Sequence, residues 1–296
     1  MKIGVIGTGY WGKNHVRTYH EMMMKGMIDS MVICDSNEAQ AKELSRTYDI
    51  EYRTDYNVML RDPDIDAVSI VTPSATHYNL AKEFMRAGKD VLVEKPMTLN
   101  SDEAKDLVNV ADKTGCILMV GHIFRYHPAV IKLKHKIYSG ELGDIKLMMS
   151  NRLDFGIPRT DMGVIHALGI HELDLYCYLM GVDFPKSITA SITGVNGIEE
   201  SALISMDFGN TKGYAHESWI MPTGKQRDIV VVGTEGHMKI DYITPPAEPL
   251  KAELIHFIDC VRTRNSPETN GMVGMRAVVM AEKALESARL GRRMIL

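Results

Sequence analysis

A glycine-rich turn near the N-terminus constrains the fold more than any other feature of the chain. The turn, GTGYWG from Gly7, separates a short apolar run from a helical pattern. In such a unit Gly7 allows a tight turn, Gly9 lets a pyrophosphate approach the backbone, and Gly12 lets the helix pack close to the strand. The sequence therefore predicts a dinucleotide site in which free N–H groups near Tyr10 and Trp11 face the phosphates.

An acidic residue at the end of the second apolar run favours NAD over NADP. Asp35 follows Gly12 by 23 residues. A carboxylate at this place accepts hydrogen bonds from both ribose hydroxyls and repels a 2′-phosphate. Ser36 and Asn37 weaken this preference. The competing interpretation is an ordinary glycine turn followed by an aspartate that caps a helix.

The first 121 residues alternate apolar runs with helical patterns. Runs that are apolar on both faces indicate a parallel sheet covered by helices, which predicts a doubly wound Rossmann domain over residues 1–121. A helix between the last two strands has a start signal, because Asn100 can cap it and Glu103 stands three residues further on. The expected strands are Lys2–Ile6, Ser30–Cys34, Ala67–Val71, Asp90–Val93 and Cys116–Val120.

The pattern changes after Gly121. Between Lys186 and Tyr242 the chain has four or five strand-like segments separated by short turns, which indicates antiparallel meander pairing. We therefore expect residues 122–296 to form an α+β domain with a mainly antiparallel, open-faced sheet, whose final helices can pack back on the first domain. Its other expected elements are a strand at Ile145–Asn151 and helices at Pro128–Ser139, Gly163–Met180, Leu250–Thr263 and Gly271–Leu290.

Composition excludes several classes of partner. The 296 residues carry a net charge of -4, which gives no sign of a nucleic-acid partner. No apolar run reaches the roughly 18 residues that span a bilayer, and a strand begins within two residues of Met1, so we expect neither a membrane segment nor a signal peptide. The four cysteines are far apart, so reduced thiols in a cytoplasmic protein are expected.

A lysine after the fourth strand is the first catalytic candidate. In a doubly wound sheet, ligands bind beyond the carboxyl ends of the strands, so Lys95 in the Glu94-Lys95-Pro96 segment is directed at the cofactor crevice. A lysine near another cation can have a lowered pKa and transfer protons. Pro96 can hold a cis bond that fixes this direction. An ordinary surface lysine remains an equally weighted interpretation.

Two further candidates follow the third strand. Thr72 and Pro73 end that strand in the same crevice, where they can contact the nicotinamide ring. His77 lies one turn further on and is counted with them on the cofactor side, although a histidine there more often begins a helix.

The second catalytic candidate is His171. Asp174 lies three residues later on the same helical face and can orient the imidazole. His171 could then exchange a proton with a carbinol while hydride moves. His166 points roughly 140° away in an α-helix, so no shared metal site is expected. The competing interpretation is two buried, hydrogen-bonded histidines in a packed helix.

These motifs together resemble the Gfo/Idh/MocA oxidoreductase family. The resemblance covers essentially the whole chain and is carried by GTGYWG, VTPSATH from Val71, VEKP from Val93, GHIFRYHPAV from Gly121 and GIHELD from Gly169. The last two are most similar to the nucleotide-sugar branch, whose members oxidise C3 of UDP-N-acetylglucosamine or its uronate with NAD.

The resemblance implies roles for particular residues. Lys95 and His171 would flank the reacting carbinol, Arg125 would line the substrate side, and Glu94 would meet the nicotinamide ribose. The open face of the second sheet would pair between subunits, which implies a homodimer or homotetramer. Asn151, Arg152 and Arg159 could bind phosphates or be solvated surface residues.

Two departures from the family pattern bear on the reaction. Ala167 stands where the family has an aspartate, four residues before the histidine, and Phe124 replaces the glutamate of an HIER pattern. The leading hypothesis is an NAD-dependent dehydrogenase of a sugar secondary alcohol, with C3 of a UDP-N-acetylhexosamine as the expected position. The alternatives are a dinucleotide-binding sensor or regulator with weak or no turnover, motivated by Ala167, and a dehydrogenase of inositol or another polyol.

Overall fold

The computed structural model describes residues 1–156, 161–222, 224–242 and 248–296. The chain forms two compact units. The first comprises Met1–Ile123 and Leu250–Met275, and the second comprises Phe124–Pro249 and Arg276–Leu296. The candidate Arg159 lies outside the described residues.

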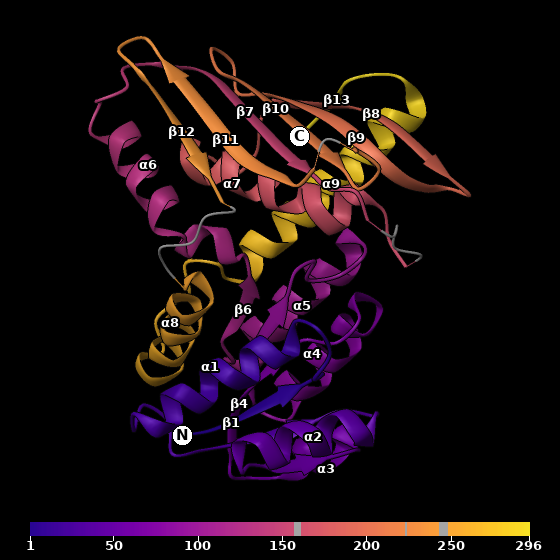
Figure 1. Ribbon diagram of the computed structural model, residues 1–296, viewed down its shortest axis with the longest axis vertical. Helices are drawn as coiled ribbons and strands as arrows, with labels where there is room; N and C mark the ends of the chain where they lie inside the picture. Colours follow the sequence, from indigo (N-terminus) through magenta and orange to yellow (C-terminus); the bar gives the residue numbers. More distant parts are fainter. Residues whose placement is uncertain (157–160, 223, 243–247) are drawn as a thin grey trace. The chain divides into compact units, whose positions relative to one another are not determined.

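The first unit contains a six-stranded parallel sheet (Figure 1). Its strand order is β3-β2-β1-β4-β5-β6, and all neighbouring strands run parallel. This confirms the predicted doubly wound Rossmann fold. The strands are β1 Lys2–Ile6, β2 Ser30–Cys34, β3 Glu51–Arg53, β4 Ile65–Ile70, β5 Asp90–Glu94 and β6 Leu118–Gly121.

Helices connect these strands, and α1 contacts α2 while α4 contacts α5. This pairing fits crossovers on opposite faces of the sheet. Asn100 caps α5 as predicted, with its side chain accepting from the Glu103 N–H at 2.9 Å. The helices are α1 Gly12–Met24, α2 Glu38–Tyr48, α3 Tyr56–Arg61, α4 His77–Arg86, α5 Ser101–Thr114 and α8 Pro249–Thr263, with short 3₁₀ turns at η1 Ser74–Thr76 and η2 Ile123–Tyr126.

Strand β3 and helix α3 were not predicted from the sequence. Strand β3 has only three residues, none of them buried, so its sequence lacks the apolar run that marked the other strands. It pairs with β2 through Val32–Cys34 and closes one edge of the sheet.

The second unit contains a seven-stranded sheet of order β12-β11-β7-β10-β9-β8-β13 (Figure 1). The sheet is mainly antiparallel, as predicted, but the expected simple meander is wrong. Strand β7 separates β11 from β10 and runs parallel to β10. The strands are β7 Ile145–Leu153, β8 Ser187–Val195, β9 Ile198–Asp207, β10 Lys212–Ser218, β11 Gln226–Gly233, β12 His237–Asp241 and β13 Met294–Ile295.

Polar contacts hold helix α7 (Ile170–Met180) on this sheet. Arg152 of β7 makes a buried ion pair with Glu172, with Nη2 2.5 Å from Oε1. The Tyr176 hydroxyl lies 2.8 Å from both the Ser150 Oγ and the Tyr214 carbonyl oxygen. The remaining helices are α6 Pro128–Tyr138 and α9 Gly271–Leu290, the second of which begins in the first unit and ends in the second.

A π-turn, η3 Ile165–Gly169, begins the helix that carries His171. The Ile170 N–H donates to the Ile165 carbonyl oxygen, five residues earlier. The 140° angle expected between His166 and His171 assumed α-helical winding, so it does not apply here. Single π-turns inside α-helices are frequent at functional sites.

Candidate functional site

The glycine turn between β1 and α1 has the geometry of a dinucleotide-binding turn. Gly7 has a φ of +92°, and a Cβ there would lie 2.6 Å from the Val71 carbonyl oxygen. A Cβ on Gly12 would lie 2.1 Å from the Gly7 carbonyl oxygen. A Cβ on Gly9 would meet no atom of the protein within 4 Å. The fold therefore requires Gly7 and Gly12, whereas Gly9 leaves room for a ligand.

A cavity of about 800 Å³ opens beside this turn within the first unit. It is large enough for a dinucleotide half, and its wall combines the glycine turn with a carboxylate at the end of β2. The predicted residues Thr72 and Pro73 line it, and Tyr10 contributes a side chain that is 92% exposed. Its other lining residues include Gly7, Gly9, Asp35, Gln40 and Tyr56.

Asp35 holds the glycine turn in place. Its Oδ2 accepts from the Thr8 N–H at 2.7 Å and from the Thr8 hydroxyl at 2.8 Å, and its Oδ1 accepts from the Asn37 N–H at 2.8 Å. An ionised carboxylate has about four acceptor positions. Asp35 therefore keeps the capacity to accept from a ribose hydroxyl while it braces the turn.

Glu94 links the end of β5 to helix α1. Its Oε1 accepts from the indole N–H of Trp11 at 2.7 Å and lies 3.0 Å from Nε2 of His15, while its Oε2 lies 3.2 Å from the Lys95 N–H. Burial by itself raises the pKa of Glu94, but the hydrogen bonds to His15 and Trp11 and the electrostatic interactions with His15 and Lys95 outweigh it, so the pKa is lowered. The carboxylate is thus ionised and held beside Lys95.

His77 joins the two loops that contain the other cofactor-side candidates. Its Nδ1 lies 2.8 Å from the Pro96 carbonyl oxygen, and its Nε2 lies 2.9 Å from the Thr72 carbonyl oxygen. The side chain is buried at the start of α4. Burial lowers the pKa of His77, although both carbonyl contacts oppose this shift. In this structure His77 is a brace between two strand ends.

Lys95 follows β5 directly and is joined to Pro96 by a cis peptide bond, the conformation considered from the sequence. Its backbone is held by Glu94 on one side and, through Pro96, by His77 on the other. The structure therefore fixes the backbone of the proposed catalytic lysine next to the dinucleotide turn.

His171 lies on α7 of the second unit and is buried. Phe124 meets its ring edge-on, with centroids 4.8 Å apart. Phe124 also contacts Tyr242 at 4.9 Å, and the Arg152 guanidinium lies over the Phe124 ring at 4.5 Å. The imidazole is thus packed against an aromatic cluster, while Lys95 belongs to the first unit.

Two arginines of the second unit are ion-paired. Arg125 donates to Asp174, from Nε at 2.9 Å and from Nη2 at 2.5 Å, and stacks on Tyr178 at 4.6 Å. Asp174, which was expected to orient His171, anchors Arg125. Arg152 is buried and not a solvated surface residue, and its ion-pair partner Glu172 is buried too. Asn151 donates to Asp228 at 3.1 Å.

Sequence reasoning missed three residues of this region: Thr8, His15 and Glu253. Thr8 and His15 acquire partners that are distant in the chain, so no local pattern marks them. Glu253 did carry a signal, since it interrupts the apolar face of α8 formed by Leu250, Leu254 and Phe257. Within the described residues no group of three or more His, Cys, Asp or Glu side chains could hold a metal ion.

Comparison with known proteins assigns the family. Residues 1–122 match the oxidoreductase family with an NAD-binding Rossmann fold, and residues 130–239 match the Gfo/Idh/MocA C-terminal domain. The two matches together cover most of the chain. The chain belongs to the Gfo/Idh/MocA oxidoreductase family. NAD is therefore confirmed as the cofactor of the first unit.

Relatives of this family member are named dehydrogenases. The UDP-N-acetylglucosamine 3-dehydrogenase of Acidithiobacillus ferrooxidans is 34% identical over 204 residues, which cover 68% of this chain and 60% of that protein. The scyllo-inositol 2-dehydrogenase (NAD(+)) of Bacillus subtilis is 28% identical, covering 90% of this chain and 88% of that protein. These similarities confirm the predicted class, an NAD(P)-dependent oxidoreductase of CH–OH groups.

The fold agrees with the solved structure of one of these relatives. The structure of the Acidithiobacillus ferrooxidans UDP-N-acetylglucosamine 3-dehydrogenase superposes with a TM-score of 0.86 at 26% identity, and covers 98% of each chain. Among the described residues, no helix is both long and apolar enough to cross a membrane.

Two glycine variants separate the fold from the ligand. We expect Gly9→Ala to leave the melting temperature unchanged and to weaken NADH binding by at least about tenfold, or about 1.4 kcal/mol, because the new methyl group enters only the ligand's space. We expect Gly12→Ala to lower the melting temperature, because its methyl group meets the Gly7 carbonyl oxygen. Thermal denaturation and NADH fluorescence titration measure both. Equal NADH affinity in Gly9→Ala and the unaltered chain would contradict the assigned turn.

The buried state of His77 predicts a pH dependence of stability. Above its ordinary pKa of 6.5 the imidazole is neutral in the folded and unfolded chains. As the pH drops below 6.5, His77 becomes protonated in the unfolded chain but stays neutral in the folded chain. The free energy of unfolding therefore decreases on acidification until the pH reaches the lowered pKa of the folded state. Burial lowers the pKa of His127, His166 and His216 in the same direction, so the comparison needs a variant.

We therefore expect His77→Gln to show a smaller loss of unfolding free energy on acidification than the unaltered chain. The slopes of unfolding free energy against pH should differ between the two proteins by up to the equivalent of one proton, which is at most about 1.4 kcal/mol per pH unit. Urea denaturation at a series of pH values on either side of 6.5 measures it. Parallel curves for the two proteins would show that His77 takes no part.

Proposed function

We propose that this chain is a sugar dehydrogenase that transfers hydride between NAD and a secondary alcohol, with C3 of a UDP-N-acetylhexosamine as the reacting position. The observation that carries the proposal is the fixed backbone of Lys95. Glu94 ties it to Trp11 of the glycine turn, and His77 ties it to the Thr72 loop, which supports a cation beside the dinucleotide site.

Each proposed catalytic residue has a role that its chemistry allows. Lys95 hydrogen-bonds the carbinol oxygen and stabilises the negative charge that develops there. His171 accepts the hydroxyl proton as general base while the carbon loses its hydrogen with both electrons. NAD, when bound, would supply the hydride acceptor at nicotinamide C4. The carbinol thereby becomes a carbonyl, and reversal of the same steps reduces it.

The remaining residues bind and orient. Gly7, Gly9, Gly12 and the helix start at Tyr10 and Trp11 would hold the pyrophosphate. Asp35 would hold the adenosine ribose, and Glu94 the nicotinamide ribose. Thr72, Pro73, His77 and Pro96 shape the nicotinamide side of the site, and Arg125 lies on the substrate side.

A UDP-sugar substrate is supported by the 34% identity to a UDP-N-acetylglucosamine 3-dehydrogenase. An inositol or another polyol is the alternative supported by the B. subtilis relative. A parallel panel of UDP-N-acetylglucosamine, its uronate, free N-acetylglucosamine and inositols, followed by NADH absorbance, discriminates these substrates. NADH formed only from inositols would overturn the nucleotide-sugar assignment.

Substitution of the two proposed catalytic residues tests the reaction itself. We expect Lys95→Met and His171→Asn each to lower kcat at least about a hundredfold, because each removes a group that meets the reacting oxygen. The affinity for NADH should stay within about threefold in His171→Asn, about 0.7 kcal/mol, since that residue is assigned to the substrate side. Steady-state kinetics and NADH titration give both values. Lys113→Met, in the last turn of α5, is a matched control for loss of a lysine charge.

The same variants test the alternative of a dinucleotide-binding sensor. Ala167 favours that alternative, because the family's aspartate is absent at this position. Tight NAD binding with turnover that Lys95→Met leaves unchanged would support the sensor and overturn the enzyme. Absence of NADH formation with every sugar, and of NADH oxidation with keto-sugars, would do the same.

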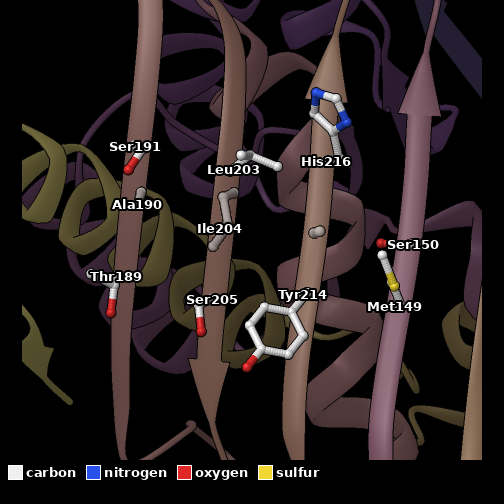
Figure 2. Close-up of a pocket in the computed structure, with 11 residues that line it drawn as sticks. Met149, Ser150, Thr189, Ala190, Ser191, Leu203, Ile204, Ser205, Tyr214 and His216 are labelled. Atoms are coloured by element: carbon white, nitrogen blue, oxygen red, sulfur yellow. The ribbon is translucent and has the colours of Figure 1, made fainter.

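We also propose a homo-oligomer, a dimer or tetramer, that forms through the open face of the second sheet. Figure 2 shows side chains of β7, β8, β9 and β10 that project from this face, with helices behind the sheet. Leu203 is 57% exposed, and Met149 and Tyr214 are also exposed. They line a shallow groove of about 300 Å³. Clustered apolar side chains on a sheet face are typical of an interface.

The proposed cellular location is cytoplasmic, where the four free thiols would remain reduced.

A charge placed on this face should reduce the mass of the assembly. We expect Leu203→Glu to convert the oligomer to a monomer, because a buried unpaired carboxylate is costly. Light scattering after size-exclusion chromatography measures the mass. Ile131→Glu is the matched control, since Ile131 is an exposed apolar residue of α6, at 49%, outside the sheet. An unaltered chain that is already monomeric would refute the oligomer.

A further inference from the structure

A buried carboxyl group on α8 has no role in the proposed reaction. Glu253 is 0% exposed, and among the described residues neither of its carboxyl oxygens has a hydrogen-bond partner. A buried polar group without a partner is rare, because its loss of hydration is uncompensated. Its presence on an otherwise apolar helix face therefore indicates an interaction that stabilises it.

The neighbours of Glu253 identify that interaction. Glu94 raises the pKa of Glu253, and Glu253 in turn raises that of Tyr19, so Glu253 lies near both of these buried residues of the first unit. His15 stands between these two residues, since its Nε2 lies 3.0 Å from Glu94 and its ring centroid 6.5 Å from that of Tyr19. The charge of Lys95 also acts on Glu94 and lowers its pKa. The Tyr19 hydroxyl is already bonded to Ser69 Oγ at 2.8 Å.

His15 has a buried ring nitrogen that lacks a hydrogen-bond partner among the described residues. Its Nε2 must donate to the ionised Oε1 of Glu94, because a carboxylate only accepts. In neutral imidazole Nδ1 is then an acceptor. This Nδ1 atom is buried and has no hydrogen-bond partner among the described residues. Burial and the nearby Glu94 charge raise the pKa of Glu253, so its carboxyl is a neutral acid with one O–H to donate.

We propose that Glu253 is a positioning residue, which donates through one internal water molecule to Nδ1 of His15 and so holds this imidazole in the tautomer that donates to Glu94. Buried waters commonly bridge such polar groups. The resulting chain runs from Glu253 through His15 to Glu94, and ends at the Lys95 N–H. It fixes the carboxylate that the proposed function assigns to the nicotinamide ribose, and thus deepens that function.

The tautomer of His15 gives a test that does not depend on turnover. Long-range ¹⁵N–¹H correlation spectra of histidine-labelled protein distinguish the two neutral tautomers and the imidazolium, and His15→Asn identifies the His15 signals. We expect the neutral Nε2–H form in the unaltered chain at neutral pH. An Nδ1–H form or an imidazolium would overturn the proposal without any variant.

Two substitutions of Glu253 sharpen the test. Glu253→Gln keeps a neutral donor, so we expect the same tautomer and NADH affinity within about twofold of the unaltered chain. Glu253→Leu keeps a similar volume without a donor, so we expect mixed His15 tautomers and NADH binding weakened about tenfold. Ile258→Val is the matched control, since it disturbs the buried face of α8 without touching a polar group.

The outcomes are separable. A Glu253→Leu protein with the unaltered tautomer and affinity would overturn the proposal, as would equal effects from Ile258→Val. Glu253→Gln that behaves like Glu253→Leu would also contradict it, because the donor would then be irrelevant. Failure of every sugar to yield NADH would count against the proposed reaction only, since the His15 spectra and NADH titration do not require a substrate.

Discussion

The ionised carboxylate of Glu94 is the interaction on which the candidate site of the first unit depends. A buried charge is costly unless several donors compensate it. Here Glu94 accepts from Trp11, which precedes helix α1, and lies against His15 of that helix and the Lys95 N–H. Gly121 makes room for this arrangement, since a Cβ there would lie 2.9 Å from the carboxylate. One carboxylate thus couples the dinucleotide turn to the proposed catalytic lysine.

Much of the fold could be predicted because its strands carry their own signal. Continuous apolar runs marked the five longer strands of the parallel sheet, and Asn100 marked a helix start. Strand β3 escaped because an exposed three-residue edge strand has no such run. The place of β7 escaped for a different reason. Its sequence indicates a strand, but its position between β10 and β11 is decided by pairing with segments more than 60 residues away.

The candidate site shows the same limit at the level of single residues. The glycine pattern predicted the dinucleotide turn because each glycine answers a local steric need. It could not show that Asp35 braces Thr8, that His77 joins Thr72 to Pro96, or that Arg152 is neutralised by Glu172. These pairs join distant elements, and a polar side chain gives no indication in sequence of whether it will face solvent or a partner.

The neighbours of Phe124 account for an aromatic residue at this position. Its ring lies under the Arg152 guanidinium and against the edge of His171. A carboxylate at this position would face an arginine whose charge Glu172 already balances, and an aromatic ring faces the same arginine without adding charge. Phe124 thus packs on an arginine that is already neutralised by the Arg152–Glu172 ion pair. Phe124 and Ala167 thus leave two positions without the carboxylates that the family pattern implies, while Glu172 and Asp174 lie on the same helix as His171.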